Sequence, residues 1–143
     1  MKIITTVSLA VMTIAAAAFF FFTPANASTE HLEKHKQPFS EAVFRQAQAD
    51  NQLVLIDVYA TWCPTCKRQH RVLNDYFAKY PDSDILVLEV DFDEQKDWVT
   101  YFKAPRQSTL ALYRGEEQLW FSVAQTRERT IFAELQKHDS AAE

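Results

Sequence analysis

Two runs of apolar and β-branched residues, separated by a helical segment, constrain the fold of this chain more than any other feature. Leu53–Tyr59 and Ile85–Phe92 are almost continuously apolar, which is typical of strands that are covered on both faces. Between them, residues 67–80 repeat apolar side chains at helical spacing until Pro81 ends the pattern. Strands joined by a helical crossover pair in parallel, so the chain is predicted to be an α/β protein.

The rest of the chain supplies further helices and a hairpin around these two strands. A helix is expected from the N-cap Ser40 to Asn51, another over Glu94–Phe102, and a last one after a cap at Thr126. Two short strands, at 109–113 and 118–123, flank a turn that contains the only glycine and therefore form a hairpin. These elements predict a central mixed β-sheet flanked by helices, with the hairpin at one edge.

The N-terminal segment has the pattern of an export signal. Lys2 precedes an apolar stretch over residues 3–22, and Ala25-Asn26-Ala27 has the small-x-small pattern of a cleavage site. We therefore expect a signal peptide over residues 1–27 and a periplasmic or otherwise exported protein. The alternative is a membrane anchor over residues 3–22, because that stretch is close to a spanning length.

The remaining residues are enough for one domain and too few for two. Its limits are expected at 38 and 137, after a flexible lead-in over residues 28–37 and before a C-terminal tail over residues 138–143. The lead-in contains His31 and His35, a near miss for the H-E-x-x-H pattern of zinc proteases, and is interpreted as a solvated linker. The formal net charge is −4 and the basic residues are scattered, which argues against a nucleic-acid partner.

The only two cysteines, Cys63 and Cys66, lie three positions apart directly after the first apolar strand. A structural disulfide framework needs several separated pairs, and a ring this small adds little loop-closure stabilisation. The pair is therefore expected to carry chemistry. At a helix start, unpaired N–H groups and the helix dipole favour a thiolate, so Cys63 is predicted to be an exposed nucleophile of low pKa. Pro64 suits the first helical position, and Cys66, one turn further, would be the resolving thiol.

Residues 57–67, which include Trp62-Cys63-Pro64-Thr65-Cys66, and residues 109–116 together resemble the thioredoxin family. The resemblance covers about residues 38–137 and implies a thioredoxin-like fold. It also implies thiol–disulfide oxidoreductase activity on protein disulfides or dithiols, without a cofactor and in a monomer. Its exported relatives favour reduction of partner disulfides, fed by a membrane thiol-electron transporter, although the direction of electron flow stays open. In the family, the residue matching Asp57 is thought to take the proton of the resolving thiol, here Cys66.

Six residues around the pair are expected to contact a partner. Trp62, Pro64 and Thr65 lie in the cysteine motif, and the resemblance implies that Gln107, Ser108 and Thr109 present their backbone to the partner, as the proline of the family does. Lys67 would stabilise a thiolate by its charge. Two positions depart from the family pattern. Ser108 stands where the family has a cis-proline, and a non-proline cis bond is costly, so the Gln107–Ser108 bond is expected to be trans. Glu89 stands where thioredoxins often have a lysine; it would face Asp57, and one of these two carboxyl groups should then stay protonated.

Two other classes of function remain open. Cys63, Cys66 and His70 form a C-x2-C-x3-H pattern in which the last two are at helical i, i+4 spacing, so they could bind zinc or copper. A redox-inert thioredoxin-like binding module is the second alternative, although it would not need two cysteines.

Overall fold

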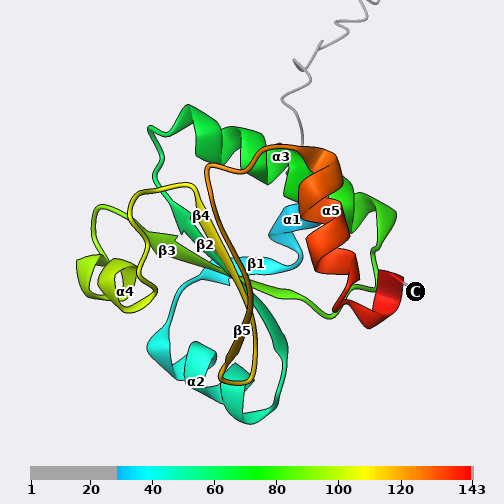
Figure 1. Ribbon diagram of the computed structural model, residues 1–143, viewed down its shortest axis with the longest axis horizontal. Helices are drawn as coiled ribbons and strands as arrows, with labels where there is room; N and C mark the ends of the chain where they lie inside the picture. Colours follow the sequence, from blue (N-terminus) through cyan, green and yellow to red (C-terminus); the bar gives the residue numbers. More distant parts are fainter. Residues whose placement is uncertain (1–28, 143) are drawn as a thin grey trace, which may run out of the picture.

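The computed structural model describes residues 29–142 and places a five-stranded mixed β-sheet between two layers of helices (Figure 1). The strands are β1 Lys36–Pro38, β2 Leu53–Tyr59, β3 Leu86–Asp91, β4 Thr109–Arg114 and β5 Glu117–Val123. The helices are α1 Glu30–Glu33, α2 Glu41–Ala49, α3 Pro64–Lys79, α4 Lys96–Tyr101 and α5 Glu128–Gln136, followed by the 3₁₀ helix η1 Ser140–Ala142. The predicted signal peptide and the alternative anchor lie outside the described residues. Within residues 29–142, no helix is both long enough and apolar enough to cross a membrane.

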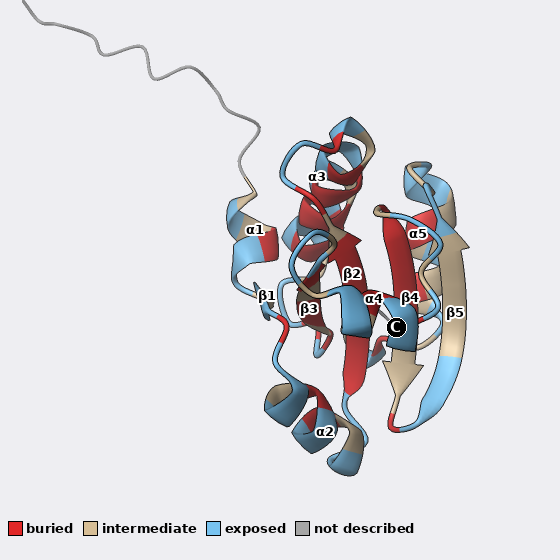
Figure 2. Cartoon of the chain, turned by 90° about the vertical axis from the view of Figure 1, so that its left-hand side faces the viewer, coloured by how far each residue is buried: buried red, intermediate tan, exposed pale blue. Residues whose placement is uncertain are grey.

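The strand order is β1-β3-β2-β4-β5, so β2 occupies the centre of the sheet. β3 pairs in parallel with both β1 and β2, whereas β4 pairs antiparallel with β2 and β5. β2 is buried along almost its whole length, and half-buried β5 closes the edge (Figure 2). Gly115, with φ +55°, sits in the turn between β4 and β5. The predicted α/β architecture and the edge hairpin are confirmed.

Alternation along β2 divides the interior into two cores. Leu53 and Leu55 face α1, α3 and α5, and they pack with Leu32, Leu73, Phe77 and Leu135. Val54, Ile56 and Val58 face α2 and α4, where they pack with Phe44 and Phe102. Because side chains alternate with a period of two, Asp57 points toward the α3 side of the sheet. The strand that builds the core therefore carries a carboxyl group to the underside of the helix that begins at the cysteine pair.

The expectation of a flexible lead-in is wrong for residues 30–37, which form α1 and the edge strand β1. The backbone N–H groups of His31 and Leu32 donate to Asn74 Oδ1 on α3, at 2.9 and 3.3 Å, and Leu32 is fully buried. His35 stacks on Phe77 with ring centroids 4.1 Å apart. The segment is held by backbone pairing and single side chains, so its sequence shows no apolar periodicity. The domain consequently begins about eight residues earlier than predicted.

The expected C-terminal tail is also wrong, since the segment after α5 packs against the domain. Asp139 is buried and accepts hydrogen bonds from Tyr76 Oη at 2.7 Å and Ser83 Oγ at 2.6 Å. Arg114 donates to the backbone oxygen of His138 at 2.7 Å. The predicted cap at Thr126 is shifted by one residue, because Arg127 occupies the N-cap of α5.

Candidate active site

The cysteine pair lies where the chain leaves β2 and enters α3. Cys63 is the N-cap residue, with extended backbone angles, and Pro64 occupies the first helical turn as predicted. Cys63 Sγ accepts a hydrogen bond from the backbone N–H of Cys66 at 3.1 Å, in the way that a serine or aspartate oxygen caps a helix. Both cysteines are free thiols. The helix start therefore offers a backbone donor to the first sulfur.

Ser108 places its hydroxyl between the two sulfur atoms. Its Oγ lies 3.1 Å from Cys63 Sγ and 3.2 Å from Cys66 Sγ. The peptide bond before it is trans, as expected, and its φ is +64°. The backbone is fixed on both sides: Ser108 N donates to Val58 O, and Ser108 O accepts from Ala124 N, each at 2.8 Å. A hydroxyl thus occupies the position next to the sulfurs that the family gives to an apolar proline ring.

Gln69, which the sequence did not single out, secures the loops beside the pair. Its Nε2 donates to Ser108 O at 3.1 Å and to Gln125 O at 2.9 Å, and its side chain is fully buried. One turn of α3 therefore ties the Ser108 loop to the segment that follows β5. Its position three residues after Cys66 carries no distinctive sequence signal.

The two thiols differ in acidity. At Cys63 burial opposes ionisation, but hydrogen bonds from the Cys66 thiol, the Ser108 hydroxyl and the backbone outweigh it and lower the pKa. At Cys66 burial dominates, joined by the hydrogen bond it gives to Cys63, and these raise the pKa to about 11. The predicted division into a nucleophile and a resolving thiol matches these directions. The expectation that Cys63 is exposed is wrong, because only 1% of its surface is accessible.

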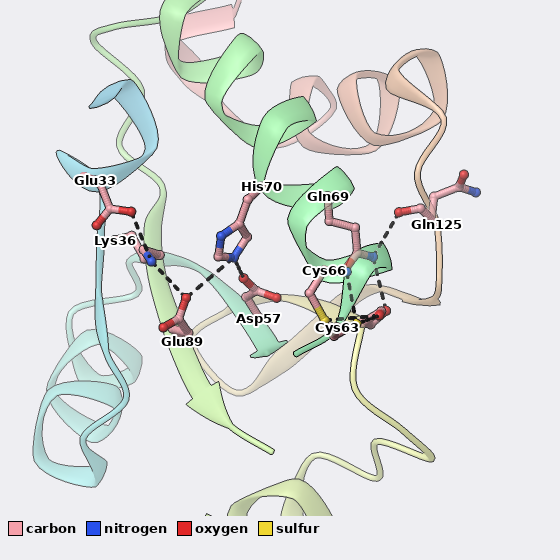
Figure 3. A network of polar contacts seen from close by, with 10 residues as sticks. Glu33, Lys36, Asp57, Cys63, Cys66, Gln69, His70, Glu89 and Gln125 are labelled. Atoms are coloured by element: carbon pink, nitrogen blue, oxygen red, sulfur yellow. Dashed lines mark hydrogen bonds and ion pairs between the residues drawn. The ribbon is translucent and has the colours of Figure 1, made fainter. Parts of the chain in front are cut away.

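On the other side of Cys66, five charged or titratable side chains form a network that starts at Asp57 (Figure 3). Asp57 Oδ2 lies 2.6 Å from His70 Nε2, and that nitrogen lies 3.5 Å from Glu89 Oε2. Lys36 Nζ lies 2.9 Å from the same Glu89 oxygen and 3.2 Å from Glu33. The ring of His70 also stacks on Tyr59 at 4.4 Å. Each carboxyl group at the centre therefore contacts a basic side chain.

Asp57 and Glu89 pair across β2 and β3 as the sequence predicted. What the sequence did not predict is that His70 lies between them and that Lys36 reaches Glu89 from β1. The sequence does not indicate this role of Lys36, because the short polar segment that forms β1 has the pattern of a linker. The i, i+4 spacing of Cys66 and His70 was noted, and it does place both residues on one face of α3; that face lies over Asp57.

The alternative metal set of Cys63, Cys66 and His70 does not come together in the structure, because His70 contacts Asp57 and Glu89 instead. Within residues 29–142, Asp57, His70 and Glu89 form the only group with metal-ligand spacing, and their ligand atoms lie within 4.8 Å of one another. The ammonium of Lys36 contacts Glu89 and opposes a second cation there. The network is thus better suited to hold a proton than a metal ion.

The expected partner contacts divide into exposed and buried residues. Trp62 is 57% exposed, and its Nε1 donates to Asp93 at 2.7 Å. Pro64 is exposed, while Thr65 and Gln107 are half-buried. Ser108 and Thr109 are fully buried, so their side chains face the interior rather than a partner. Lys67 is exposed and forms no ion pair with any described residue.

Comparison with known proteins gives consistent matches over this domain. The family model for thioredoxin matches residues 31–137. The thiol:disulfide interchange protein DsbE of Yersinia pestis is 32% identical over 94 residues, which are 63% of this chain and 45% of that protein. A thioredoxin H-type of Brassica campestris is 31% identical over 98 residues, covering 68% of this chain and 77% of the relative. The chain thus spans less than half of the DsbE relative, and 65% of thioredoxin-1 of Drosophila melanogaster.

Solved structures agree with these matches. The crystal structure of Trxlp from Edwardsiella tarda EIB202 is 43% identical and covers 70% of this chain and 97% of that chain, with a TM-score of 0.66. Mitochondrial thioredoxin 3 of Saccharomyces cerevisiae, at 22% identity, covers 77% of this chain and 99% of that chain with a TM-score of 0.61, and shares the fold.

Proposed function

Because the chain belongs to the thioredoxin family, we propose that it is a thiol–disulfide oxidoreductase that reduces disulfides of partner proteins through Cys63 and Cys66. The observation that carries this proposal is the opposite shift of the two thiols: the pKa of Cys63 is lowered and that of Cys66 is raised to about 11. Cys63 is therefore the more acidic thiol and forms the attacking thiolate first, as an ordered exchange requires.

In the first step, the Cys63 thiolate attacks one sulfur of the partner disulfide. The partner's other sulfur leaves as a thiolate, and a mixed disulfide joins Cys63 to the partner. The Ser108 hydroxyl, 3.1 Å from Cys63 Sγ, donates to the thiolate before the attack. In the second step, Cys66 loses its proton and attacks Cys63 Sγ, and the second partner sulfur leaves. The partner gains two electrons, and the Cys63–Cys66 pair is oxidised to a disulfide.

Asp57 is the proposed acceptor for the Cys66 proton. It lies on β2 under the face of α3 that carries Cys66, and it contacts His70 one turn along that face. Its Oδ1 is buried and has no hydrogen-bond partner in the structure, so one carboxylate oxygen is free to accept a proton.

The reducing direction is supported by how the sulfurs are buried. Strong oxidants of this class owe their potential to a stabilised reduced form. Here burial opposes the thiolate at both cysteines, and at Cys66 it prevails. Only the thiolate of Cys63 therefore stabilises the reduced pair. This limited stabilisation favours transfer of electrons from the cysteine pair to the partner disulfide.

The cell envelope is the proposed location, and a monomer the proposed state. The export signal expected over residues 1–27 supports this location, and so does the likeness to a DsbE protein. An exported reductant must itself be reduced, which implies a membrane thiol-electron transporter as its source. N-terminal sequencing of the exported protein tests the first point: a mature end just after Ala27 is expected, and an intact Met1 would overturn the cleavage.

The redox potential tests the direction. We expect the Cys63/Cys66 pair, equilibrated against glutathione, to lie nearer the roughly −270 mV of thioredoxin than the roughly −120 mV of strong oxidants. A value near the oxidising end would overturn the reductase assignment. The variant Cys66→Ser should accumulate mixed disulfides with partners, whereas Cys63→Ser, the matched control, should trap none.

A further inference from the structure

Asp57 has no direct way to exchange a proton with water. The side chain is fully buried, and Cys66 and Cys63 beside it are 0% and 1% exposed. A proton taken from Cys66 must therefore leave through another group. Among the described residues, one carboxylate oxygen, Oδ1, has no hydrogen-bond partner, and the other, Oδ2, lies 2.6 Å from His70 Nε2. The carboxyl group thus has one oxygen open for a proton and one already joined to a histidine.

His70 reaches from this buried carboxyl group to the surface. It is held by its stack on Tyr59, 4.4 Å between ring centroids, and its own exposure is only 6%. It also lines a surface cavity of about 400 Å³, whose wall includes Lys36 and Glu89. In Figure 3 this network lies on the opposite side of Cys66 from Gln125. The histidine is the step between the buried carboxyl group and water.

We infer that His70 is the positioning residue that carries the proton of the resolving step from Asp57 to the solvent. It acts through Asp57 and does not touch the reacting sulfurs. The inference rests on the proposed function and deepens it. A contact this short between a carboxyl oxygen and a ring nitrogen requires a hydrogen between them, and the proposed transfer starts with Asp57 as a carboxylate and His70 as an imidazolium.

In this transfer the Asp57–His70 pair gains one proton from Cys66 and loses one proton to water. Cys66 gives its proton to Asp57 Oδ1, and its electron pair forms the new bond to Cys63 Sγ while the bond from Cys63 to the partner breaks. The imidazolium of His70 now faces a neutral carboxyl group instead of a carboxylate. It releases one proton to water in the cavity, and the partner leaves as a thiolate.

The groups around His70 come from five elements. Glu89 on β3 lies 3.5 Å from its Nε2, and Lys36 on β1 pairs with Glu89 at 2.9 Å. Tyr59 on β2 covers the ring, and Glu33 on α1 pairs with Lys36. From α3 itself, Lys67 and Arg71 line the same cavity. Among these side-chain types, histidine is the one that ordinarily gains and loses a proton near neutral pH.

The test separates the two chemical steps with a small aromatic disulfide, 5,5′-dithiobis(2-nitrobenzoate). Mixed rapidly with the reduced protein, it releases one coloured thiolate when Cys63 attacks and a second when Cys66 resolves the mixed disulfide. His70→Gln keeps an amide donor for Asp57 but cannot carry a proton. We expect the second phase to slow by about tenfold or more and to lose an inflection in its pH profile, while the first phase changes by less than about twofold.

A matched control and a chemical rescue sharpen the result. His35→Gln removes a histidine that also stacks on an aromatic ring, Phe77, but lies outside the network, so both phases should be unchanged. In His70→Ala, added imidazole should accelerate the second phase and leave the first as it was.

The outcomes are distinguishable. A second phase in His70→Gln with the wild-type rate and pH profile overturns the inference and leaves the proposed function standing. If neither phase occurs in the wild-type protein, or if Cys63→Ser shows both, the proposed function fails instead. If His70→Gln also loses the first phase, the variant cannot decide, and the pH profile of the second phase in the wild-type protein is used instead. Histidines ordinarily titrate between about pH 5 and 8, so a wild-type profile without an inflection in this range overturns the inference.

Discussion

Ser108 holds its hydroxyl between two sulfur atoms from a backbone conformation that serine seldom adopts. A φ of +64° costs a non-glycine residue of the order of 1 kcal/mol, and the structure maintains it with hydrogen bonds to Val58, Ala124 and Gln69. Strain that is fixed by so many partners is usually retained for a function. The function here is to aim a donor at Cys63, so that this residue tunes the thiol in place of the proline of other family members.

Ser108→Gly tests this tuning, because glycine suits a positive φ and removes the hydroxymethyl group that carries the donor. The Cys63 thiolate then loses a donor, so we expect the pKa of Cys63 to rise back toward its ordinary value. The pH dependence of the thiolate ultraviolet absorbance, or of alkylation by iodoacetamide, measures it.

Ser122→Gly is the matched control for that measurement. Ser122 lies on β5, the strand next to β4, and its hydroxyl has no hydrogen-bond partner within the described residues. Its replacement should leave the Cys63 titration unchanged. An equal pKa of Cys63 in the Ser108 variant and in the control would show that the hydroxyl does not tune the thiol.

At the scale of elements, the helices and strands that could be predicted are those with a regular apolar pattern in the sequence. β2, α3, β3 and the β4–β5 hairpin bury apolar side chains in regular patterns, so their existence and order were predictable. α1, β1 and η1 are short and polar and are held by contacts to distant residues such as Asn74 and Tyr76, which no local pattern encodes. The same limit applies to the site. Cys63, Cys66, Asp57 and Glu89 are predictable from the sequence, whereas the contact of Lys36 depends on the docking of β1 and the partners of His70 depend on the packing of α3 over β2 and β3.

The closing segment after α5 is expected to stabilise the domain through one carboxylate. Asp139 is 1% exposed and accepts from both Tyr76 and Ser83. Asp139→Ala leaves two buried hydroxyl groups without acceptors, so we expect the free energy of unfolding to fall by roughly 2 to 5 kcal/mol. Urea unfolding followed by circular dichroism measures the difference.

Asp82→Ala is the control for this change, since Asp82 is an exposed carboxylate in the turn that carries Ser83. Its effect should stay within about 0.5 kcal/mol, as for most surface substitutions. If Asp139→Ala were as mild as the control, the C-terminal segment would be a tail after all.

Considered as a whole, the molecule buries several weak acids in their neutral form. Burial is the largest cause at each: it raises the pKa of Cys66 to about 11 from 9.0, and it raises the pKa values of Tyr59, Tyr76 and Tyr113 above 10.0. At Tyr76 the hydrogen bond to Asp139 adds to it. These groups come from both cores, so ionising them opposes folding throughout the domain.

The reduced protein should therefore lose stability at alkaline pH. Below about pH 9 the folded and unfolded chains both keep these protons, and the stabilisation is fully present. As the pH rises from 9.0 toward 11, the unfolded chain releases the Cys66 proton first, so the equilibrium shifts toward unfolding. The contribution of Cys66 alone is of the order of 2 kcal/mol. Lys36, whose pKa is raised despite burial by its bonds to Glu89 and Glu33, loses its pairing in the same direction at still higher pH.

Urea unfolding under anaerobic, reducing conditions at about pH 8 and about pH 10.5 measures this loss. Cys66→Ser cannot ionise in this range, so it should lose less stability than the wild-type protein between the two conditions. Tyr76→Phe should reduce the loss at the most alkaline end, because it removes the phenol whose ionisation the fold disfavours most strongly. A wild-type stability that stays level across the interval would mean that the unfolded and folded thiols titrate alike, and the asymmetry of the cysteine pair would then need another origin than burial.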